Sequence, residues 1–433
     1  MRKTVIFMAL AVLLALTSIH PIAAQDKPVL KIAWWGSQSR HDRTIKVIDM
    51  YKATHPDIDI TYDFAGFNDY WTKLTTQASG GKLPCLMQQD YAYLAEWVKQ
   101  GLVVPLDDFI KQGLLNVSDV PDPVLAGGRI NDKLYGLNLG INSQSIILDV
   151  DAFKKAGIDL PAPNWTWADF DKIVTQLHDK LGIWGMGPAL SDEQLWKSLY
   201  LGNGEWAFNN DGNEIGYKDD KPIIDYFKMI MNLQDAKAVP GQDTEAQYTK
   251  AGPEGAPIVT SKAAMQYQWS NQVVAVWKAS GDGRHFKLAP LPRIVGGKSA
   301  NYIKPSMFFS ITSQCETPEL AKEAAKFMDY FTNSKEANDI LFAERGVPVS
   351  TKILDYLQPK LDPATAETFA FLSLVGKDVS PIPPPDPAGW ADIRNNIYMP
   401  QFVEAVLFKQ ISPEDGAKLL RDEANKILAK NKK

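Results

Sequence analysis

The sequence predicts an α/β fold divided into two lobes, and three observations support this prediction. The chain has 433 residues, which is more than a single hydrophobic core usually supports. Residues 29–100 alternate between strand and helix patterns in the order β-α-β-α-β-α, which is typical of a unit built on a parallel sheet. A different series of helices begins after residue 149. We therefore expect two units of mixed helix and strand.

The first unit is predicted from short apolar runs with amphipathic segments between them. Residues 29–34 form an apolar run of the kind found in a buried parallel strand. A helix follows and ends before Pro56. Residues 58–64 alternate apolar and polar side chains, which predicts a second strand. Three further segments complete the unit: a helix over 68–79, a short strand over 83–88 and a helix over 91–100.

The remainder of the chain contains longer helices and scattered strands. Residues 134–149 form two extended runs on either side of Gly140, and the helix that begins at Thr166 carries an apolar stripe on one face. Residues 209–216 have the turn chemistry of a hairpin. Further elements are predicted as follows: strands at 263–268, 286–289 and 307–311, helices from 317 and from 412, and a rigid proline-rich surface loop at 381–387.

The first 24 residues have the three parts of a secretory signal. Arg2 and Lys3 precede an apolar run from Val5 to Leu16, and small residues end at Ala24. We expect cleavage after Ala24. The apolar run holds about a dozen residues, whereas a membrane span needs roughly 20, and no cysteine directly follows it to carry a lipid. The mature chain is therefore expected to be exported without an anchor.

The composition of the mature chain limits the classes of partner it is expected to bind and bears on the redox state of its cysteines. Without the signal the chain carries 44 basic and 51 acidic residues, and this mild acidity argues against a nucleic-acid or anionic-membrane partner. The chain has two cysteines, Cys85 and Cys315. In an oxidising compartment they either form one disulfide bond or stay as two buried thiols, and the sequence leaves both states open.

The sequence contains no catalytic or metal-binding motif. Residues 296–299 end like a phosphate loop, but Pro292 stands where the first glycine belongs. The chain has neither a G-x-S-x-G nor an H-E-x-x-H motif, and its five histidines are too scattered for a metal cluster. Carboxylates are too numerous for a glycosidase pair to be singled out. We expect a protein that is not an enzyme and needs neither a metal nor another cofactor.

Four segments carry a family resemblance that covers nearly the whole mature chain. They are LKIAWWGSQSRHDRTIKVIDMYKATHP (30–56), TKLTTQASGGKLP with YAYLAEWVKQGLVVPLDDFI (72–84 and 91–110), SKAAMQYQWSNQVVAVWKAS (261–280), and TPELAKEAAKFMDYFTN with GVPVSTK (317–333 and 346–352). The chain resembles family 1 of the extracellular solute-binding proteins of bacterial ABC importers, in the carbohydrate-binding group similar to maltose-binding protein. It departs from the family pattern at Cys85, where Asp is common, and at Ser261, where Gly is common.

The resemblance implies a two-lobed periplasmic-binding-protein fold, in which each lobe is a mixed sheet flanked by helices and a hinge joins the lobes. It places residues 25–138 and 286–343 in lobe 1, and residues 139–285 and 344–433 in lobe 2. The implied function is a periplasmic receptor that captures an oligosaccharide in an inter-lobe cleft and delivers it to a membrane permease. WWG followed by SRH and TIK is most similar to members that import pectin-derived oligosaccharides, which makes a uronide one implied ligand. A monomer is expected.

Sugar binding explains the choice of candidate site residues. A pyranose ring needs flat apolar platforms and a few placed polar groups, and Arg can grip a uronate carboxylate with two parallel hydrogen bonds. Ligands of open α/β sheets bind beyond the carboxyl ends of the strands, so the candidates follow predicted strands or lie on nearby segments. They are Trp34, Trp35, Arg40, Phe67, Asp90 and Tyr91 from the first lobe, and Asn142, Trp196, Trp269 and Trp390 from the second.

Several of these candidates also have a purely structural interpretation. Trp34 shares its phase with the apolar residues of the first strand and is assigned mainly to the sheet, whereas Trp35 and Arg40 are assigned to the cleft. Asp90 alternatively caps the next helix. Trp196 is equally compatible with the core of the second lobe.

Two alternative functions stay open. A secreted carbohydrate-active enzyme would use the same aromatic platforms, but it would also need an acid and a base beside the scissile bond. Within the binding class, a receptor for a monosaccharide or a polyol is the alternative, because the candidate residues do not define the length of the ligand.

Overall fold

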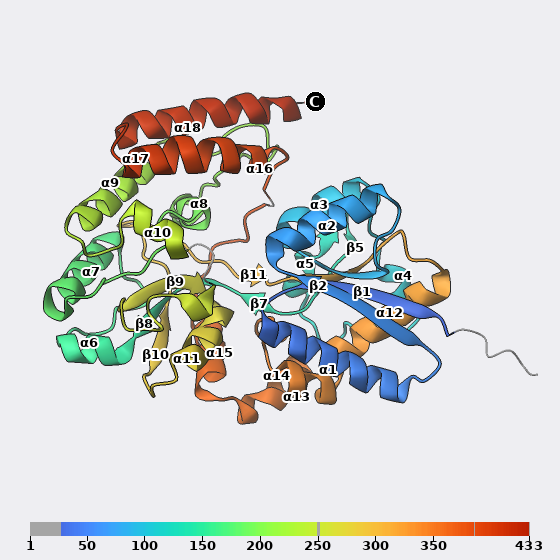
Figure 1. The fold of residues 1–433 in the computed structure, drawn as a ribbon. Helices are drawn as coiled ribbons and strands as arrows, with labels where there is room; N and C mark the ends of the chain where they lie inside the picture. The colour runs from blue at the N-terminus through green and yellow to red at the C-terminus, as the bar shows by residue number, and fades with distance from the viewer. Residues whose placement is uncertain (1–26, 249–251, 385, 433) are drawn as a thin grey trace, which may run out of the picture.

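The computed structural model describes residues 27–248, 252–384 and 386–432. The signal peptide predicted over residues 1–24 lies outside the described residues. Two α/β lobes lie side by side and are joined by a central region (Figure 1). Within the described part of the chain, no helix is both long and apolar enough to cross a membrane.

The first lobe contains a five-stranded mixed sheet with the strand order β2-β1-β3-β12-β6. β1 pairs in parallel with β2 and β3, and β12 pairs antiparallel with β3 and β6. The strands are β1 (Val29–Trp35), β2 (Asp59–Ala65), β3 (Leu86–Gln89), β6 (Leu137–Asn138) and β12 (Phe308–Ile311). Because β12 comes from much later in the chain, this lobe is built from two chain segments.

Helices cover both faces of this sheet, with α2 and α3 on one side and α1, α12 and α13 on the other (Figure 1). A parallel sheet needs this arrangement because its strands are apolar on both faces. The helices are α1 (Gln38–Thr54), α2 (Phe67–Ser79), α3 (Tyr91–Lys99), α4 (Asp107–Lys111), α5 (Asp122–Ala126), α12 (Pro318–Asn333) and α13 (Lys335–Leu341). A small hairpin is formed by β4 (Arg129–Ile130) and β5 (Lys133–Leu134).

The second lobe contains an antiparallel sheet with the order β10-β8-β9. Its strands are β8 (Gln144–Asp149), β9 (Met265–Trp269) and β10 (Phe286–Ala289). The lobe boundary predicted at residue 286 is therefore wrong, because all of β10 pairs with β8 and so belongs to the second lobe. A strand pattern shows that a strand forms, but it does not show which distant strand becomes its partner.

The helices of the second lobe surround an aromatic core. The large aromatic side chains of this core that are at most 2% exposed include Trp196, Tyr200, Tyr217, Phe227 and Tyr398. The α-helices are α6 (Val150–Ala156), α7 (Trp167–Leu181), α8 (Glu193–Gly202), α9 (Lys221–Asp235), α10 (Gln242–Tyr248), α11 (Val273–Ser280), α15 (Pro363–Val375), α16 (Trp390–Ile393), α17 (Ala405–Leu407) and α18 (Pro413–Leu428). A π-helix spans Arg394–Glu404, and 3-10 turns span Pro253–Gly255, Ser270–Gln272, Gln358–Lys360 and Ala429–Asn431.

Within the described ranges, three chain segments cross between the lobes. β7 (Ile141–Asn142) pairs antiparallel with β11 (Lys304–Pro305), and these two strands lie in the centre of Figure 1. Ile141 also bridges to Val347. Val347 packs with second-lobe residues, whereas Val349 packs in the core of the first lobe. The third crossing therefore extends beyond the boundary predicted at residue 344, and α14 (Thr351–Leu357) follows it.

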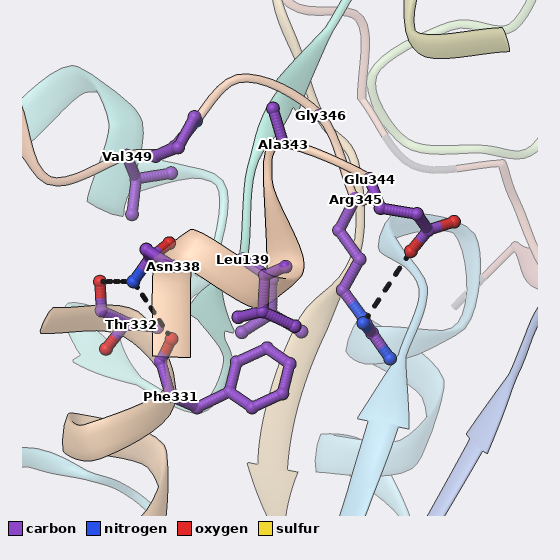
Figure 2. A pocket seen from close by; sticks show the side chains of 11 residues that line it. Leu139, Phe331, Thr332, Asn338, Ala343, Glu344, Arg345, Gly346 and Val349 are labelled. Atoms are coloured by element: carbon purple, nitrogen blue, oxygen red, sulfur yellow. Dashed lines mark hydrogen bonds and ion pairs between the residues drawn. The ribbon is translucent and has the colours of Figure 1, made fainter. Parts of the chain in front are cut away.

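A small pocket lies beside this third crossing (Figure 2). Its lining includes Phe331, Leu341 and Arg345. Gly346 in the same segment has a φ of +109°, and a Cβ atom there would lie 2.6 Å from Asn142 Oδ1. The crossing therefore depends on glycine, because both the backbone conformation and the close contact with β7 exclude a side chain.

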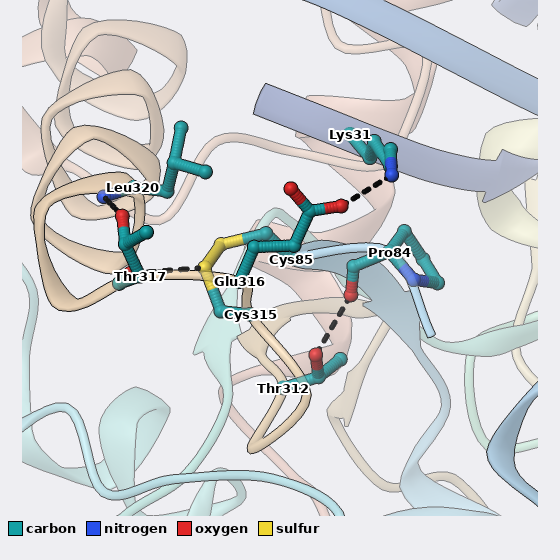
Figure 3. Close-up of a disulfide and its surroundings, with 8 residues drawn as sticks. All are labelled: Lys31, Pro84, Cys85, Thr312, Cys315, Glu316, Thr317 and Leu320. Carbon is teal, nitrogen blue, oxygen red and sulfur yellow. Dashed lines mark hydrogen bonds and ion pairs between the residues drawn. A yellow bond between two sulfur atoms is a disulfide. The ribbon is translucent and has the colours of Figure 1, made fainter. Parts of the chain in front are cut away.

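Cys85 and Cys315 form a disulfide bond, which decides between the two states that the sequence leaves open (Figure 3). Their Cα atoms are 4.2 Å apart and their positions are separated by 230 residues. Cys85 directly precedes β3, and Cys315 follows β12, the antiparallel neighbour of β3. The bond therefore joins the two chain segments of the first lobe.

Candidate functional site

The two adjacent tryptophans point to opposite faces of the first sheet, and both are buried. Trp34 is fully buried, its indole Nε1 donates to His41 Nδ1 at 3.0 Å, and its ring packs on Phe64. Trp35 is only 8% exposed. Three aromatic rings surround Trp35: Phe67, Tyr70 and Trp71. The prediction that Trp35 lines the cleft is contradicted. Helices cover both faces of the sheet (Figure 1), so a side chain on the face opposite Trp34 is also buried.

Phe67 forms the accessible edge of this aromatic cluster. It is the first residue of α2 and is 42% exposed. Its ring lies 5.4 Å from Trp35 and 6.4 Å from Tyr93. Tyr93 packs in turn on Trp71, with ring centres 4.2 Å apart. Phe67 and Tyr93 therefore give the first lobe a partly exposed aromatic surface beside α3.

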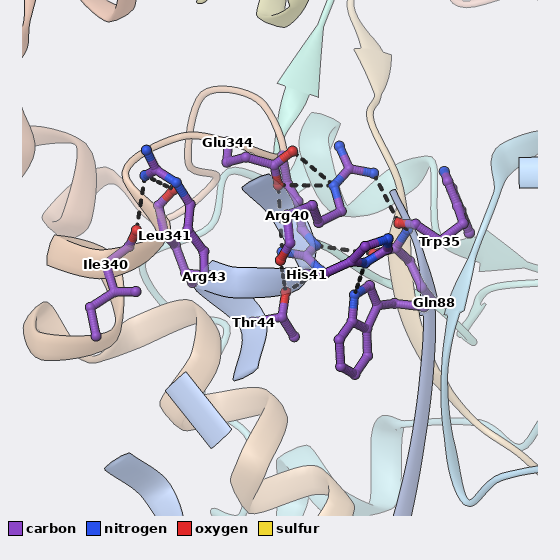
Figure 4. Close-up of polar contacts among 11 residues, drawn as sticks. Trp35, Arg40, His41, Arg43, Thr44, Gln88, Ile340, Leu341 and Glu344 are labelled. Carbon is purple, nitrogen blue, oxygen red and sulfur yellow. Dashed lines mark hydrogen bonds and ion pairs between the residues drawn. The ribbon is translucent and has the colours of Figure 1, made fainter. Parts of the chain in front are cut away.

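Arg40 is buried and forms its hydrogen bonds with other groups of the protein. The residue is 7% exposed. Its Nε donates to both oxygens of Glu344, at 2.9 and 3.0 Å, and its Nη1 donates to the Trp35 carbonyl at 3.2 Å (Figure 4). The assignment of Arg40 to the cleft is contradicted, because its partner lies on the third crossing, which a local pattern does not reveal. Arg40 ties the start of α1 to that crossing.

A second arginine extends this buried network. Arg345 is 4% exposed, its Nε donates to Gln88 Oε1 at 3.0 Å and its Nη2 donates to Thr44 Oγ1 at 2.8 Å. Its Nη1 also lies 3.7 Å from the Glu344 carboxylate. Burial acts to raise the pKa of Glu344, but the two guanidinium groups outweigh burial and hold this pKa below its ordinary value. Two buried cations therefore share one carboxylate.

His41 lies beside the same network and is held neutral. Burial, followed by the positive charges of Arg40 and Arg345, lowers the pKa of His41 below 6.5, while Glu344 and Asp42 oppose this shift. The Nδ1 atom accepts the Trp34 hydrogen bond, which requires an unprotonated nitrogen at that position. The imidazole also stacks on Phe64.

The neutral His41 predicts a loss of stability in mild acid. Below pH 6.5 the unfolded chain binds a proton at this histidine while the folded chain resists it, so the free energy of unfolding falls as the pH falls. We expect His41→Gln to lose less stability than the wild type between pH 7.5 and 5.5, measured by urea unfolding. His285→Gln, at an exposed histidine, is the control. Parallel curves for the wild type and His41→Gln would contradict the assignment.

The two lobes touch where Tyr91 meets the proline-rich loop. The Tyr91 hydroxyl donates to the Pro383 carbonyl at 3.2 Å. Asp90 beside it accepts from the Ala92 amide and so caps α3, as the structural interpretation predicts. The other oxygen of Asp90 lies 3.6 Å from Lys304 Nζ. Asp90 therefore faces the hinge strand β11 while it caps a first-lobe helix.

Trp269 approaches the same lysine from the second lobe. It is half-buried at the end of β9, and Lys304 Nζ lies 5.0 Å from its ring centre. Tyr302 lies 6.4 Å from the Trp269 ring. Asn142 is the cross-strand partner of Lys304, is 5% exposed, and its Oδ1 has no hydrogen-bond partner among the described residues. Residues of both lobes and of the hinge thus gather around Lys304, and we refer to this region as the lobe junction.

The two remaining tryptophan candidates have different environments. Trp196 is fully buried and stacked on Tyr398, so it belongs to the second-lobe core and presents no surface to a ligand. Trp390 is 9% exposed, with Lys197 Nζ 4.1 Å from its ring centre. Lys197 also donates to both oxygens of Asp386, at 2.6 and 2.7 Å. Trp390 therefore lies beneath an ion pair that reaches the proline-rich loop.

A third ion pair lies at the start of α8. Arg394 Nε donates to Glu193 Oε1 at 2.9 Å. The preceding residue, Asp192, caps α8 by accepting from the Gln194 amide. Burial and then the Glu193 carboxylate raise the pKa of Asp192 to about 7. Tyr93 of the first lobe lies within electrostatic range of Arg394 and Asp386, so this group also borders the lobe junction.

Several charged or aromatic side chains of the lobe junction are absent from the predicted set, among them Lys197, Tyr302, Lys304, Asp386 and Arg394. Asp386 lies in the proline-rich loop, which the sequence marks as a rigid loop but not as part of a site. Lys304 lies three residues before a predicted strand and has no pattern of its own. Within residues 27–248, 252–384 and 386–432, no group of three His, Cys, Asp or Glu side chains is arranged to hold a metal ion.

The two lobes, the three crossings and the lobe junction define a two-lobed solute-binding protein. A family model described as bacterial extracellular solute-binding protein matches residues 38–338. The chain belongs to this family, and it is accordingly a solute-binding receptor of an ABC transporter.

Relatives and solved structures agree with this family. An uncharacterised lipoprotein of Streptomyces antibioticus is 22% identical over 419 residues, which cover 92% of this chain and 88% of the relative. An extracellular solute-binding protein of family 1 from Alicyclobacillus acidocaldarius is 28% identical with a TM-score of 0.70, over 94% and 100% of the two chains. A periplasmic oligogalacturonide-binding protein from Yersinia enterocolitica, in complex with saturated digalacturonic acid, is 21% identical with a TM-score of 0.80, over 94% and 100%.

Proposed function

We propose that this receptor is a periplasmic monomer that captures an oligosaccharide at the lobe junction and delivers it to the permease of an ABC importer. It acts by binding and not by catalysis. A sugar that contacts both lobes favours the form in which the lobes are closed together, because only that form makes both sets of contacts. The permease then distinguishes the closed receptor from the open one.

The observation that carries this proposal is the meeting of both lobes and the hinge around Lys304. Trp269 supplies a half-buried aromatic face from the second lobe, and Asp90 and Tyr91 come from the first. An aromatic face with a few polar groups around it is the combination that a pyranose ring requires. Because Lys304 lies on a hinge strand, a ligand bound beside it would contact both lobes and the hinge.

The uronide implied by the resemblance has one structural relative in its support, the Yersinia protein that binds digalacturonic acid. Arg40, the side chain expected to grip the carboxylate, is bound to Glu344 instead. A uronide would therefore have to use a cation of the lobe junction.

Replacement of Trp269 tests the proposed site. We expect the mature protein to bind at least one member of a panel of neutral and uronic di- and trisaccharides in calorimetry. Trp269→Ala should bind that sugar about fivefold or more weakly, since a stacked aromatic face contributes about 1 kcal/mol or more. Trp277→Ala is the control, because Trp277 is a partly buried tryptophan of the same lobe whose ring packs on His285 and Phe286.

Small-angle scattering should show a smaller radius of gyration with the bound sugar than without it. Equal binding by Trp269→Ala and the control would place the site elsewhere. Turnover of any sugar in the panel would instead favour the secreted enzyme, and binding of monosaccharides or polyols alone would favour the shorter ligands.

A further inference from the structure

We propose that the lobe junction selects uncharged oligosaccharides and rejects uronates, because each of its cations is already paired with a carboxylate of the chain. This inference rests on the proposed function and assigns the substrate class of that site. It concerns three cations, Lys304, Lys197 and Arg394, and the carboxylates that face them.

Lys304 is the central cation of the three. Its ammonium lies 3.6 Å from Asp90 Oδ2 and 5.0 Å from the ring centre of Trp269. Lys304 and Asp90 are mostly buried, with 19% and 11% of their side-chain surface exposed. A sugar stacked on Trp269 would therefore meet an ammonium with a carboxylate beside it. A second carboxylate at this position would lie close to Asp90 and would be repelled.

The other two cations are held more tightly. Lys197 donates to both oxygens of Asp386 at 2.6 and 2.7 Å, and only 14% and 20% of these side chains are exposed. Arg394 Nε donates to Glu193 at 2.9 Å. A ligand carboxylate at either cation would lie beside the carboxylate that already neutralises it and would be repelled, unless it displaced that carboxylate. Displacement would leave a partly buried carboxylate without its counter-ion, which is strongly unfavourable.

Among the described residues, each cation that we assign to the lobe junction has a carboxylate partner. Three carboxylates, Asp90, Glu193 and Asp386, pair with the three cations, and Asp192, whose pKa is raised to about 7, is a fourth carboxyl group beside them. Arg40 of α1 and Arg345 of the third crossing do not change this balance, because both are buried and share Glu344.

Sugar hydroxyls, in contrast, fit such paired groups. Carboxylate oxygens retain lone pairs and ammonium groups retain N–H donors after an ion pair forms, and a hydroxyl both donates and accepts. An uncharged sugar can thus satisfy these groups without breaking an ion pair. The ion pairs of the lobe junction can therefore hydrogen-bond to neutral sugars, whereas they disfavour the binding of anionic sugars.

Asp90→Asn is the decisive variant. Asparagine caps a helix as well as aspartate does, so α3 keeps its cap, while Lys304 loses its counter-charge. The probes are α-1,4-digalacturonate, which carries two carboxylates, and a panel of neutral disaccharides that includes α-1,4-galactobiose. Asp362→Asn is the matched control, because Asp362 is an exposed aspartate that caps α15 and hydrogen-bonds to Ala364 and Thr365 of that helix.

We expect the wild type to bind a neutral disaccharide of the panel at least about tenfold more tightly than digalacturonate, by calorimetry and thermal shift. Asp90→Asn should gain affinity for digalacturonate by about tenfold or more, and this gain should shrink as the salt concentration rises. The control should behave as the wild type does.

Each of the other outcomes overturns either this inference or the proposed function. If the wild type binds digalacturonate as tightly as any neutral sugar, the inference is overturned while the proposed function stands. If the wild type rejects digalacturonate and Asp90→Asn gains nothing, the paired charge is not the cause and the inference is again overturned. If no saccharide of either kind binds, the proposed function itself fails.

Discussion

Glu344→Gln should lower the free energy of unfolding by about 3–5 kcal/mol, which is the cost of removing one partner from a buried ion pair. Glu344 is the carboxylate that Arg40 and Arg345 share. Glutamine retains an oxygen that can accept from Arg40, but it leaves two buried cations without a counter-charge. Urea unfolding of the mature protein at pH 7.5 measures the change.

Two further variants serve as controls in the same unfolding experiment: one that breaks an exposed ion pair, and one that removes both partners of the buried ion pair. Asp422→Asn breaks an exposed pair with Lys418 on α18 and should leave the unfolding midpoint unchanged. Arg40→Met combined with Glu344→Gln should be more stable than the sum of the two single changes predicts, since the double variant buries one unpaired cation fewer. A loss from Glu344→Gln no larger than that from the surface pair would show that the network is not structural.

Trp34→Ala and Trp35→Ala should each lower the free energy of unfolding by about 3–5 kcal/mol. The sequence predicts this loss for Trp34 alone and assigns Trp35 to ligand binding. The burial of both rings, on opposite faces of one sheet, changes that expectation. Denaturant unfolding of the two variants is the measurement. Phe67→Ala, which truncates a ring that is 42% exposed, should cost clearly less than either.

The outcome for Trp35 separates the two interpretations of the motif. Loss of sugar binding by a Trp35→Ala protein of wild-type stability would restore the ligand role that the sequence suggested. A large loss of stability, with sugar binding retained by the fraction that still folds, would establish Trp35 as a core residue.

The elements of the fold could be predicted because their signals are local. The alternation over residues 58–64 predicts β2, and the strand predicted at 286–289 is β10 with the same bounds. The partner of β10 could not be predicted, because its pairing with β8 depends on a strand far earlier in the chain. Periodicity thus identifies strands, while the division into lobes depends on contacts between distant segments.

The residues of the candidate site could likewise be predicted only where they follow a strand that the sequence itself indicates. Asp90, Tyr91 and Trp269 follow strands, and the structure brings them together at the lobe junction. Arg40 follows a strand too, but the position of Glu344, 304 residues later, turns it inward. Lys304 was missed because its importance comes from its neighbours in space and not from its neighbours in sequence.

The disulfide bond between Cys85 and Cys315 also changes what a protease can release. It closes a covalent ring of chain that contains β8, β9 and β10, so the sheet strands of the second lobe all lie inside this ring. One cut anywhere between the two cysteines opens the ring without separating the pieces. A nicked receptor would therefore migrate as a single chain on a non-reducing gel and would divide into two fragments only after reduction.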